Sequence, residues 1–335
     1  MSDTNSKNQS IQVPPNLLVL VFDGRGGARK SSLEEASEIG HGTNDFGFAW
    51  INIRKDESGA EAALATCKLG SEISDALMAA ETRPRCTVIG EGALINFRGV
   101  NLNEGADPED MISARLWVEQ NKIVGVWLRP LKAVSDILES VNANRAPRTT
   151  GGFIATLALR LIDRMEPVVS ELNERVDGLE ERILDEEIPD LQSELTSIRR
   201  RSIIIRRFIF PQRDALTTLH LEELPWLDDR DRGRIAEAVD RITRLAEELN
   251  AIRERAAAVQ DQIVERRASL LNRNMLLLAI FTVVFLPLQF LTGLLGMNVE
   301  GIPGAKHPLA FTIVTVAMAV IAGLTYWLLS RKRFL

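Results

Sequence analysis

A stripe of polar side chains runs through an apolar segment near the end of the chain. Met275–Leu295 contains no charged residue, yet Thr282 and Gln289 stand within it. Polar groups in the middle of a bilayer are costly when they face lipid, but they are stable when they line water or bond to another helix. The spacing therefore leaves two possibilities open, a water-filled pathway for a polar solute and hydrogen bonding between helices.

The stripe extends beyond these two residues, because positions three and four apart share one face of a helix. Ala279 lies on the same face, and Ala268 continues it toward the N-terminus. The spacing favours a pore over interhelical bonding. The predicted pore-lining residues are Asp261, Glu265, Asn272, Met275, Thr282, Leu286, Gln289 and Gly293. Two helices cannot enclose a pore, so transport would require an oligomer.

A long helix must position this stripe. Apolar residues recur at alternating intervals of three and four upstream of it, at Ile242, Leu245, Leu249, Ile252, Ala256, Val259 and Ile263. This spacing is typical of an apolar seam on a long helix. A helix from Gly233 to Asn298 would be on the order of 100 Å long. Asp261 precedes Ile263 by two residues, about 200° around a helix, so the acidic face should point away from the seam.

Two segments are long enough to cross a bilayer once, residues 275–295 and 309–329. The short connection, 296–308, predicts an antiparallel hairpin, and Pro287 is expected to kink the first span. Arg266, Arg267 and Arg273 precede the first span, and basic residues follow the second. The positive-inside rule then places both termini in the cytoplasm. The alternative, that one segment is a buried helix of a soluble protein, is disfavoured because both runs have basic flanks.

The preceding residues predict a mixed, mostly antiparallel α/β domain. Residues 1–15 are polar and expected to be disordered, without a cleavable signal peptide. The expected strands are 17–22, 46–53, 86–89, 93–97, 111–118 and 122–128, the last two forming a hairpin, and the expected helices are 71–80 and 134–140. Helices are predicted for 153–187 and, interrupted at Pro211, for 190–221; Asp228 or Asp229 should cap the long helix.

These segments define an α+β cytosolic domain, a long-helix stalk and two C-terminal transmembrane helices. The predicted boundaries are 1–15 for the disordered terminus, 16–148 for the α/β domain, 149–272 for the stalk and 273–335 for the two-span domain.

Composition narrows the function classes. The net charge of −6 argues against a nucleic-acid binder, and no nucleophile, catalytic triad or cofactor fingerprint supports an enzyme. Cys67 and Cys86 lack metal-ligand spacing and are expected to be free thiols. The glycine-rich residues 23–27 predict a plain loop in preference to a phosphate cradle, and the acidic residues 107–110 predict a turn or helix start in preference to a metal site.

At the end of the polar stripe the chain has Gly296-Met297-Asn298, just before the second of two C-terminal spans. In this context the tripeptide resembles the signature of the CorA superfamily of divalent-cation transporters. Residues 206–214, RRFIFPQRD, resemble the family's basic stretch in the stalk. Residues 97–110 and 298–304 resemble its ZntB-like zinc-transporter branch, so the likeness covers nearly the whole chain.

The resemblance implies a funnel-shaped homopentamer in the inner membrane, with a central pore lined by the first span. It implies that Gly296, Met297 and Asn298 form the entrance ring, where Asn298 would hold a hydrated cation through its waters. Glu300 would raise the local cation concentration. His307 is expected to be a solvated loop residue rather than a zinc ligand. Met297 departs from the Val or Ile frequent in the ZntB-like branch, and this keeps Mg²⁺ as a candidate.

The leading hypothesis is an inner-membrane zinc transporter, with proton coupling as in ZntB-like relatives. The expected partners are the lipid bilayer, further copies of the chain and divalent cations, with Zn²⁺ first and Mg²⁺, Co²⁺, Ni²⁺ and Cd²⁺ as further candidates; no cofactor and no nucleic acid are expected. The alternative within the class is a Mg²⁺ or Co²⁺ channel. A membrane-anchored cytosolic sensor is a third hypothesis, which the polar stripe disfavours because an anchor needs neither Thr282 nor Gln289.

Overall fold

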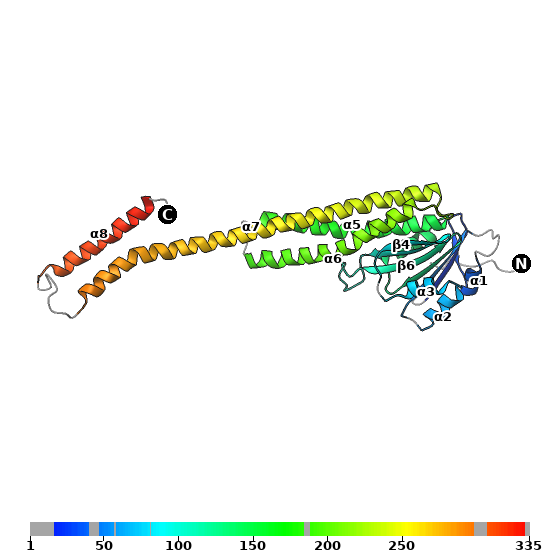
Figure 1. Cartoon of the computed structure of the whole chain (residues 1–335), viewed down its shortest axis with the longest axis horizontal. Helices are drawn as coiled ribbons and strands as arrows, with labels where there is room; N and C mark the ends of the chain where they lie inside the picture. Colours follow the sequence, from blue (N-terminus) through cyan, green and yellow to red (C-terminus); the bar gives the residue numbers. More distant parts are fainter. Residues whose placement is uncertain are drawn as a thin grey trace. The chain divides into compact units, whose positions relative to one another are not determined.

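The computed structural model describes residues 17–39, 47–56, 58–80, 82–183, 188–297 and 307–331. The chain divides into two compact units, Met1–Val259 and Gln260–Leu335. Helix α7 (Asp229–Leu295) contributes to both units, and α8 (Ala310–Arg331) follows in the second (Figure 1). The boundaries predicted between the α/β domain, the stalk and the spans stay predictions, and the expected disorder of 1–15 lies outside the described residues.

A seven-stranded sheet forms the centre of the first unit, in the order β2-β1-β3-β7-β6-β5-β4. Only the β3–β7 pair is parallel, which confirms the mostly antiparallel expectation. The expected hairpin is β6–β7, closed by the Glu119–Lys122 pair. The strands are β1 (Leu17–Phe22), β2 (Ala28–Lys30), β3 (Phe48–Arg54), β4 (Arg85–Ile89), β5 (Gly92–Gly99), β6 (Ile112–Glu119) and β7 (Lys122–Trp127).

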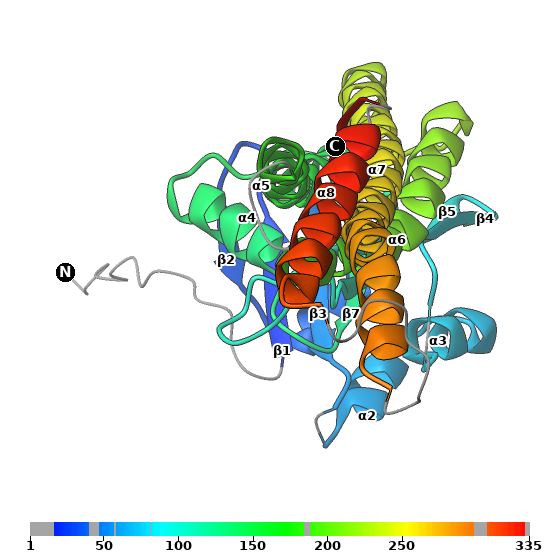
Figure 2. The ribbon, with the colours of Figure 1, turned by 90° about the vertical axis from the view of Figure 1, so that its left-hand side faces the viewer.

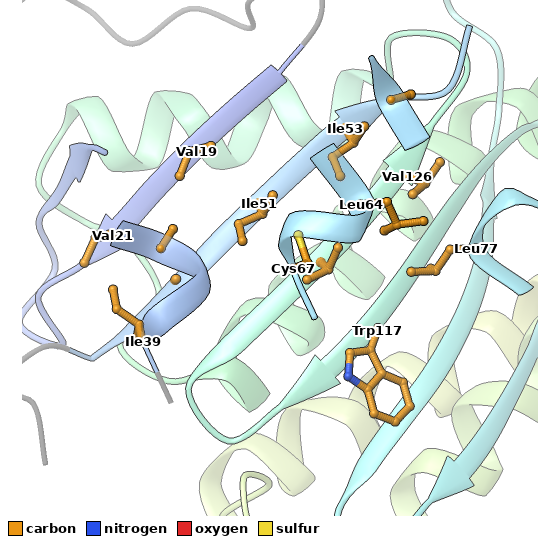
Figure 3. Packing of buried hydrophobic residues seen from close by; sticks show 14 of the residues in the cluster. Val19, Val21, Ile39, Ile51, Ile53, Leu64, Cys67, Leu77, Trp117 and Val126 are labelled. Atoms are coloured by element: carbon orange, nitrogen blue, oxygen red, sulfur yellow. The ribbon is translucent and has the colours of Figure 1, made fainter. Parts of the chain in front are cut away.

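Three short helices cover one face of the sheet: α1 (Leu33–Glu38), α2 (Ala60–Thr66) and α3 (Ser71–Met78). Figure 2 shows α2 and α3 on the side of the sheet opposite α4, α5 and α6. Alternate side chains of the strands, such as Val19, Ile51 and Val126, point into this layer and meet Leu64 and Leu77 from the helices (Figure 3). The alternation follows from the two-residue period of a strand.

An aromatic cluster holds the other face of the sheet to α5 (Thr150–Arg182), which α4 (Lys132–Asn142) precedes. Phe22 of β1 stacks on Phe48 of β3 with ring centroids 4.2 Å apart. Phe153, in the first turn of α5, meets Phe22 and Phe48 edge-on at 6.1 Å and lies 4.7 Å from Trp50. Phe153 is fully buried, so this cluster fixes the start of α5 on the sheet.

Helices α5, α6 (Ile188–Leu221) and the first part of α7 run alongside one another (Figure 1). Two arginines of α7 join it to α5: Arg241 pairs with Asp163 and Glu166, and Arg255 pairs with Asp177 and Glu180. The predicted seam is buried, since its members from Ile242 to Ile263 are at most 5% exposed. Asp228 accepts the amide hydrogen of Asp231 at 2.7 Å, which confirms the expected cap at the start of α7.

The structure corrects several local predictions. Strand β2 and helices α1 and α2 were not expected, because segments of three to seven residues are too short to show a clear period. The predicted interruption of α6 at Pro211 is wrong, since the helix runs through it. The neighbours of Pro211 explain this: Ile209 and Gln212 are buried, and their packing offsets the hydrogen bond that proline cannot donate. Pro189 lies in the first turn of α6, where proline is tolerated.

We predict that Leu249→Ala lowers the free energy of unfolding by about 2–5 kcal/mol, because Leu249 is fully buried in the seam and its truncation leaves a cavity. Glu247→Ala, on the exposed side of the same turn, is the matched control and should change it by about 0.5 kcal/mol or less. Denaturant unfolding followed by tryptophan fluorescence measures both. Equal effects of the two substitutions would show that the seam does not hold α7.

Candidate functional site

The structure leaves every predicted pore-lining side chain of α7 exposed. Asp261, Glu265, Asn272, Met275, Thr282, Leu286, Gln289 and Gly293 are all in the exposed class within this single chain. Met275 and Leu286 are each 64% exposed, which leaves two large apolar side chains uncovered. The stripe is therefore available to lipid, water or another copy of the chain. Its role as a pore lining stays a prediction.

A second face of α7, directly opposite the stripe, is partly covered. Its half-buried positions in the membrane segment are Ile280, Val284, Pro287, Leu288 and Leu291. Leu291 is nine residues from Thr282, which places the two side chains about 180° apart at 100° per residue. The covered face and the polar stripe are thus on opposite sides of the helix.

Helix α8 carries a matching half-buried face. Its positions Thr325, Ile321, Met318 and Val314 have the same 4-3-4 spacing, in reverse order, as Ile280, Val284, Pro287 and Leu291 of α7. The described part of the second unit contains only these two helical segments, and Figure 1 shows α8 turning back along the last turns of α7. Helix α8 thus runs antiparallel to the end of α7, and these two faces have the spacing needed to pack on each other. Packing through them would turn the polar stripe away from α8.

The hydroxyl groups in the first span are satisfied within the helix. Thr282 donates to the carbonyl oxygen of Leu278 at 2.8 Å, and Thr292 donates to that of Leu288 at 3.0 Å. Gln289 is different, since its side chain makes no hydrogen bond with any described residue of the chain and lies in the exposed class. A free primary amide at this depth needs water or a neighbouring subunit as its partner.

Gly296 and Met297 follow the end of α7. The amide of Gly296 donates to the carbonyl oxygen of Thr292 at 2.9 Å. A Cβ atom at Gly296 would lie 2.8 Å from that same oxygen, so the absence of a side chain allows this turn. The side chain of Met297 is 49% exposed. Asn298 and Glu300, the residues expected to attract the cation, lie outside the described residues.

His307 has a local structural role. Its Nδ1 atom accepts the amide hydrogen of Leu309 at 3.2 Å, just before α8 begins. One ring nitrogen is thus engaged by the backbone.

In the part of the chain that the structure describes, no three side chains of the types His, Cys, Asp and Glu form a metal-binding group. The acidic residues 107–110 do not form one: Glu109 pairs with Arg201 at 3.0 Å, and both side chains are at least 86% buried.

Residues 206–214, predicted as a family-like stretch, join α6 to the sheet. Gln212 is 1% exposed and accepts the backbone amide hydrogen of Arg98 in β5 at 2.6 Å. The guanidinium groups of Arg98 and Arg207 lie 4.9 and 5.0 Å from the ring centroid of Phe208. This stretch therefore packs α6 against β5.

Comparison with known proteins now gives these features a context. Residues 45–333 match the family model described as CorA-like Mg2+ transporter protein. The chain is 37% identical over 318 residues to the divalent cation transporter CmaX of Pseudomonas aeruginosa, covering 94% of this chain and 95% of the relative. It is 30% identical over 330 residues to the zinc transport protein ZntB of Klebsiella pneumoniae, covering 98% and 99%.

Solved structures of two relatives have the same fold as this chain. Full-length CmaX matches with a TM-score of 0.79 at 34% identity, over 96% of this chain and 99% of that one. The CorA magnesium transporter of Methanocaldococcus jannaschii matches with a TM-score of 0.80 over 97% and 100%; at 18% identity it supports the fold alone.

The chain therefore belongs to the CorA-like family of divalent-cation transporters. This membership confirms the resemblance seen in the sequence and the expectation that the protein is not an enzyme. Two of its helices, α7 and α8, are long and apolar enough to span a membrane. The α8-facing residues of α7 were not singled out in the sequence, although the recurrence of Ile280, Val284 and Leu291 at helical spacing is visible there.

The surroundings of the two cysteines show whether either thiol is suited to bind zinc. Burial raises the pKa of Cys67 to about 11 and that of Cys86, with a further contribution from Glu222, to about 12. Cys67 is fully buried in the cluster of Figure 3. Since the thiolate is both the nucleophile and the metal ligand, both thiols should be poor zinc ligands at neutral pH.

We predict that iodoacetamide alkylates both cysteines of the native protein at least about a hundredfold more slowly at pH 7 than in the unfolded chain, and that the native rate rises with pH. Mass spectrometry of the labelled peptides measures each rate, and the chain in guanidinium chloride is the control. Native labelling that becomes fast only after a chelator is added would instead identify a thiolate–metal site.

Proposed function

We propose that this protein transports Zn²⁺ across the inner membrane, through a pore that the polar stripe of α7 lines in a homo-oligomer, most simply a pentamer. The polar stripe carries the pore proposal, because it faces directly away from the only other helix described in its unit. An exposed Gln289 in an apolar segment needs a polar environment that lipid does not offer. Other subunits and water along a central axis supply one.

The choice of zinc rests on relatives and on the loop after α7. Proteins described as zinc transporters match over 98% of this chain, and residues 298–304 resemble that branch. Magnesium is the second candidate, favoured by Met297 and by the description of the family model. Asn298 would hold a hydrated cation at the entrance, with Gly296, Met297 and Glu300 beside it. Both termini would lie in the cytoplasm.

The proposal is tested by metal uptake into proteoliposomes containing the full-length protein, with Zn²⁺ and Mg²⁺ supplied separately and with or without a pH gradient. We expect zinc flux that increases with the gradient. Magnesium flux that is indifferent to pH would contradict the zinc assignment and support the second candidate. Flux of neither metal would leave the anchored sensor as the better description.

Asn298→Ala should abolish this flux while leaving the oligomer intact, because it removes the amide that would bind the hydrated cation. Size-exclusion chromatography with light scattering checks assembly of the variant. A variant with unchanged flux would remove the entrance ring from the mechanism.

A matched pair of threonines tests the stripe itself. Thr282→Val should reduce zinc flux several-fold, whereas Thr292→Val should leave it unchanged. Both hydroxyls donate to a carbonyl four residues earlier, so both substitutions lose the same kind of bond. Thr292 lies about 80° away from Thr282 around the helix, outside the stripe. A larger loss at Thr292 would place the pathway on another face.

A further inference from the structure

A groove lined by arginines lies in the first unit, outside the predicted pathway. It has a volume of about 590 Å³ and is lined by six arginines and two aspartates, a formal charge of +4 in a chain whose net charge is −6. The arginines are Arg25, Arg145, Arg148, Arg160, Arg230 and Arg234. Like charges gathered in one place repel each other, so the concentration needs an explanation.

Two loops bring the first three arginines together. The turn between β1 and β2 is closed by Asp23, whose carboxylate accepts the amide hydrogens of Arg25 and Gly27 at 2.7 and 2.9 Å. The carbonyl oxygen of Gly26 in this turn accepts the amide hydrogen of Ala146 at 2.9 Å. Gly26 has a φ of +113°, and a Cβ there would lie 2.9 Å from the oxygen of Asn144. This close approach sets Arg25 beside the segment that carries Arg145 and Arg148.

The starts of α5 and α7 form the other wall. Thr149 accepts the amide hydrogen of Gly152 at 2.9 Å and donates its own hydroxyl to Asp231. Arg234 adds hydrogen bonds to the carbonyl oxygen of Gly152 at 3.2 Å and to Thr156 at 2.9 Å. The wall is thus rigid before any ligand arrives, which lowers the entropic cost of binding.

The charge in the groove is not neutralised by its own carboxylates. Asp228 caps α7, and Asp231 accepts the Thr149 hydroxyl, so both are engaged with helix ends. Among the described residues, Arg25, Arg145, Arg148 and Arg230 form no side-chain hydrogen bond or ion pair, and all four are exposed. The other two lining arginines are engaged: Arg160 pairs with Asp163 at 3.2 Å, and Arg234 is held by Gly152 and Thr156.

We propose that this groove binds a soluble phosphorylated small molecule with at least two phosphoryl groups. Guanidinium groups bind phosphate oxygens through two parallel hydrogen bonds, more tightly than a neutral donor does. With the Arg160–Asp163 pair counted as neutral, the groove keeps a formal charge of +3, which matches a polyvalent anion better than a single carboxylate. Bound there, the anion would bridge the β1–β2 turn, the segment before α5 and the first turn of α7. It would therefore act on the helix that continues into the spans.

The test uses the full-length protein in a maltoside detergent, with inorganic pyrophosphate as the probe and isothermal titration calorimetry as the readout. Orthophosphate and sulfate are titrated at the same ionic strength. We expect pyrophosphate to bind at least about tenfold more tightly than either and to raise the melting temperature. No binding of pyrophosphate by the wild-type protein, or equal binding of all three anions, would overturn the proposal.

Two triple variants of equal charge assign the site. Arg145→Gln, Arg148→Gln and Arg230→Gln together should weaken pyrophosphate binding at least about a hundredfold, without changing the melting temperature of the anion-free protein. Arg199→Gln, Arg200→Gln and Arg253→Gln, exposed arginines outside the groove, should leave binding unchanged. Equal weakening by both sets would overturn the proposal, as would displacement of pyrophosphate by dihexanoyl-phosphatidylglycerol, which would assign the groove to a lipid headgroup.

Discussion

Helix α7 is one continuous helix whose two parts suit different environments, water in the first unit and an apolar medium in the second. The rest of the structure depends on this change along the helix. In the first unit the seam residues from Ile242 to Val259 are buried and most polar side chains of α7 are outside. In the second unit the pattern is reversed: most of its surface is apolar and exposed, and a narrow polar stripe remains. A lipid-facing helix needs no such stripe. The stripe is therefore the feature that distinguishes a transport pathway from a simple membrane anchor.

The hairpin with α8 restricts where that stripe can point. The reverse-ordered 4-3-4 spacing of half-buried residues matches one face of α7 to one face of α8, and Thr282 lies about 180° away from the centre of that face of α7. In the first unit, Arg241 and Arg255 tie α7 to α5 through four carboxylates. Each unit thus holds one face of the helix and leaves another uncovered. In the proposed oligomer, further copies of the chain would cover the faces left open.

The sequence predicted long elements well and short ones poorly. The seam follows from a period that repeats over many residues, the β6–β7 hairpin follows from alternation in two neighbouring strands, and the two spans follow from long apolar runs. Helices α1 and α2 were missed because neither completes two turns. The predicted interruption of α6 at Pro211 is wrong because the packing of the buried Ile209 and Gln212 outweighs the tendency of proline to break a helix. The arginine groove could not be predicted, since Arg25 and Arg230 come to line one groove only after the β1–β2 turn closes on the segment before α5.

Cysteine accessibility along α7 in membranes tests the central claim most directly. Single cysteines are placed at each position from 275 to 293 and labelled with a charged, membrane-impermeant thiol reagent; the high pKa of Cys67 and of Cys86 keeps their background low. The account predicts a helical period, with labelling at 275, 279, 282, 286, 289 and 293 and protection at 280, 284, 287 and 291. Uniform protection, or labelling of the α8-facing positions in preference to the stripe, would contradict a pore lined by this face.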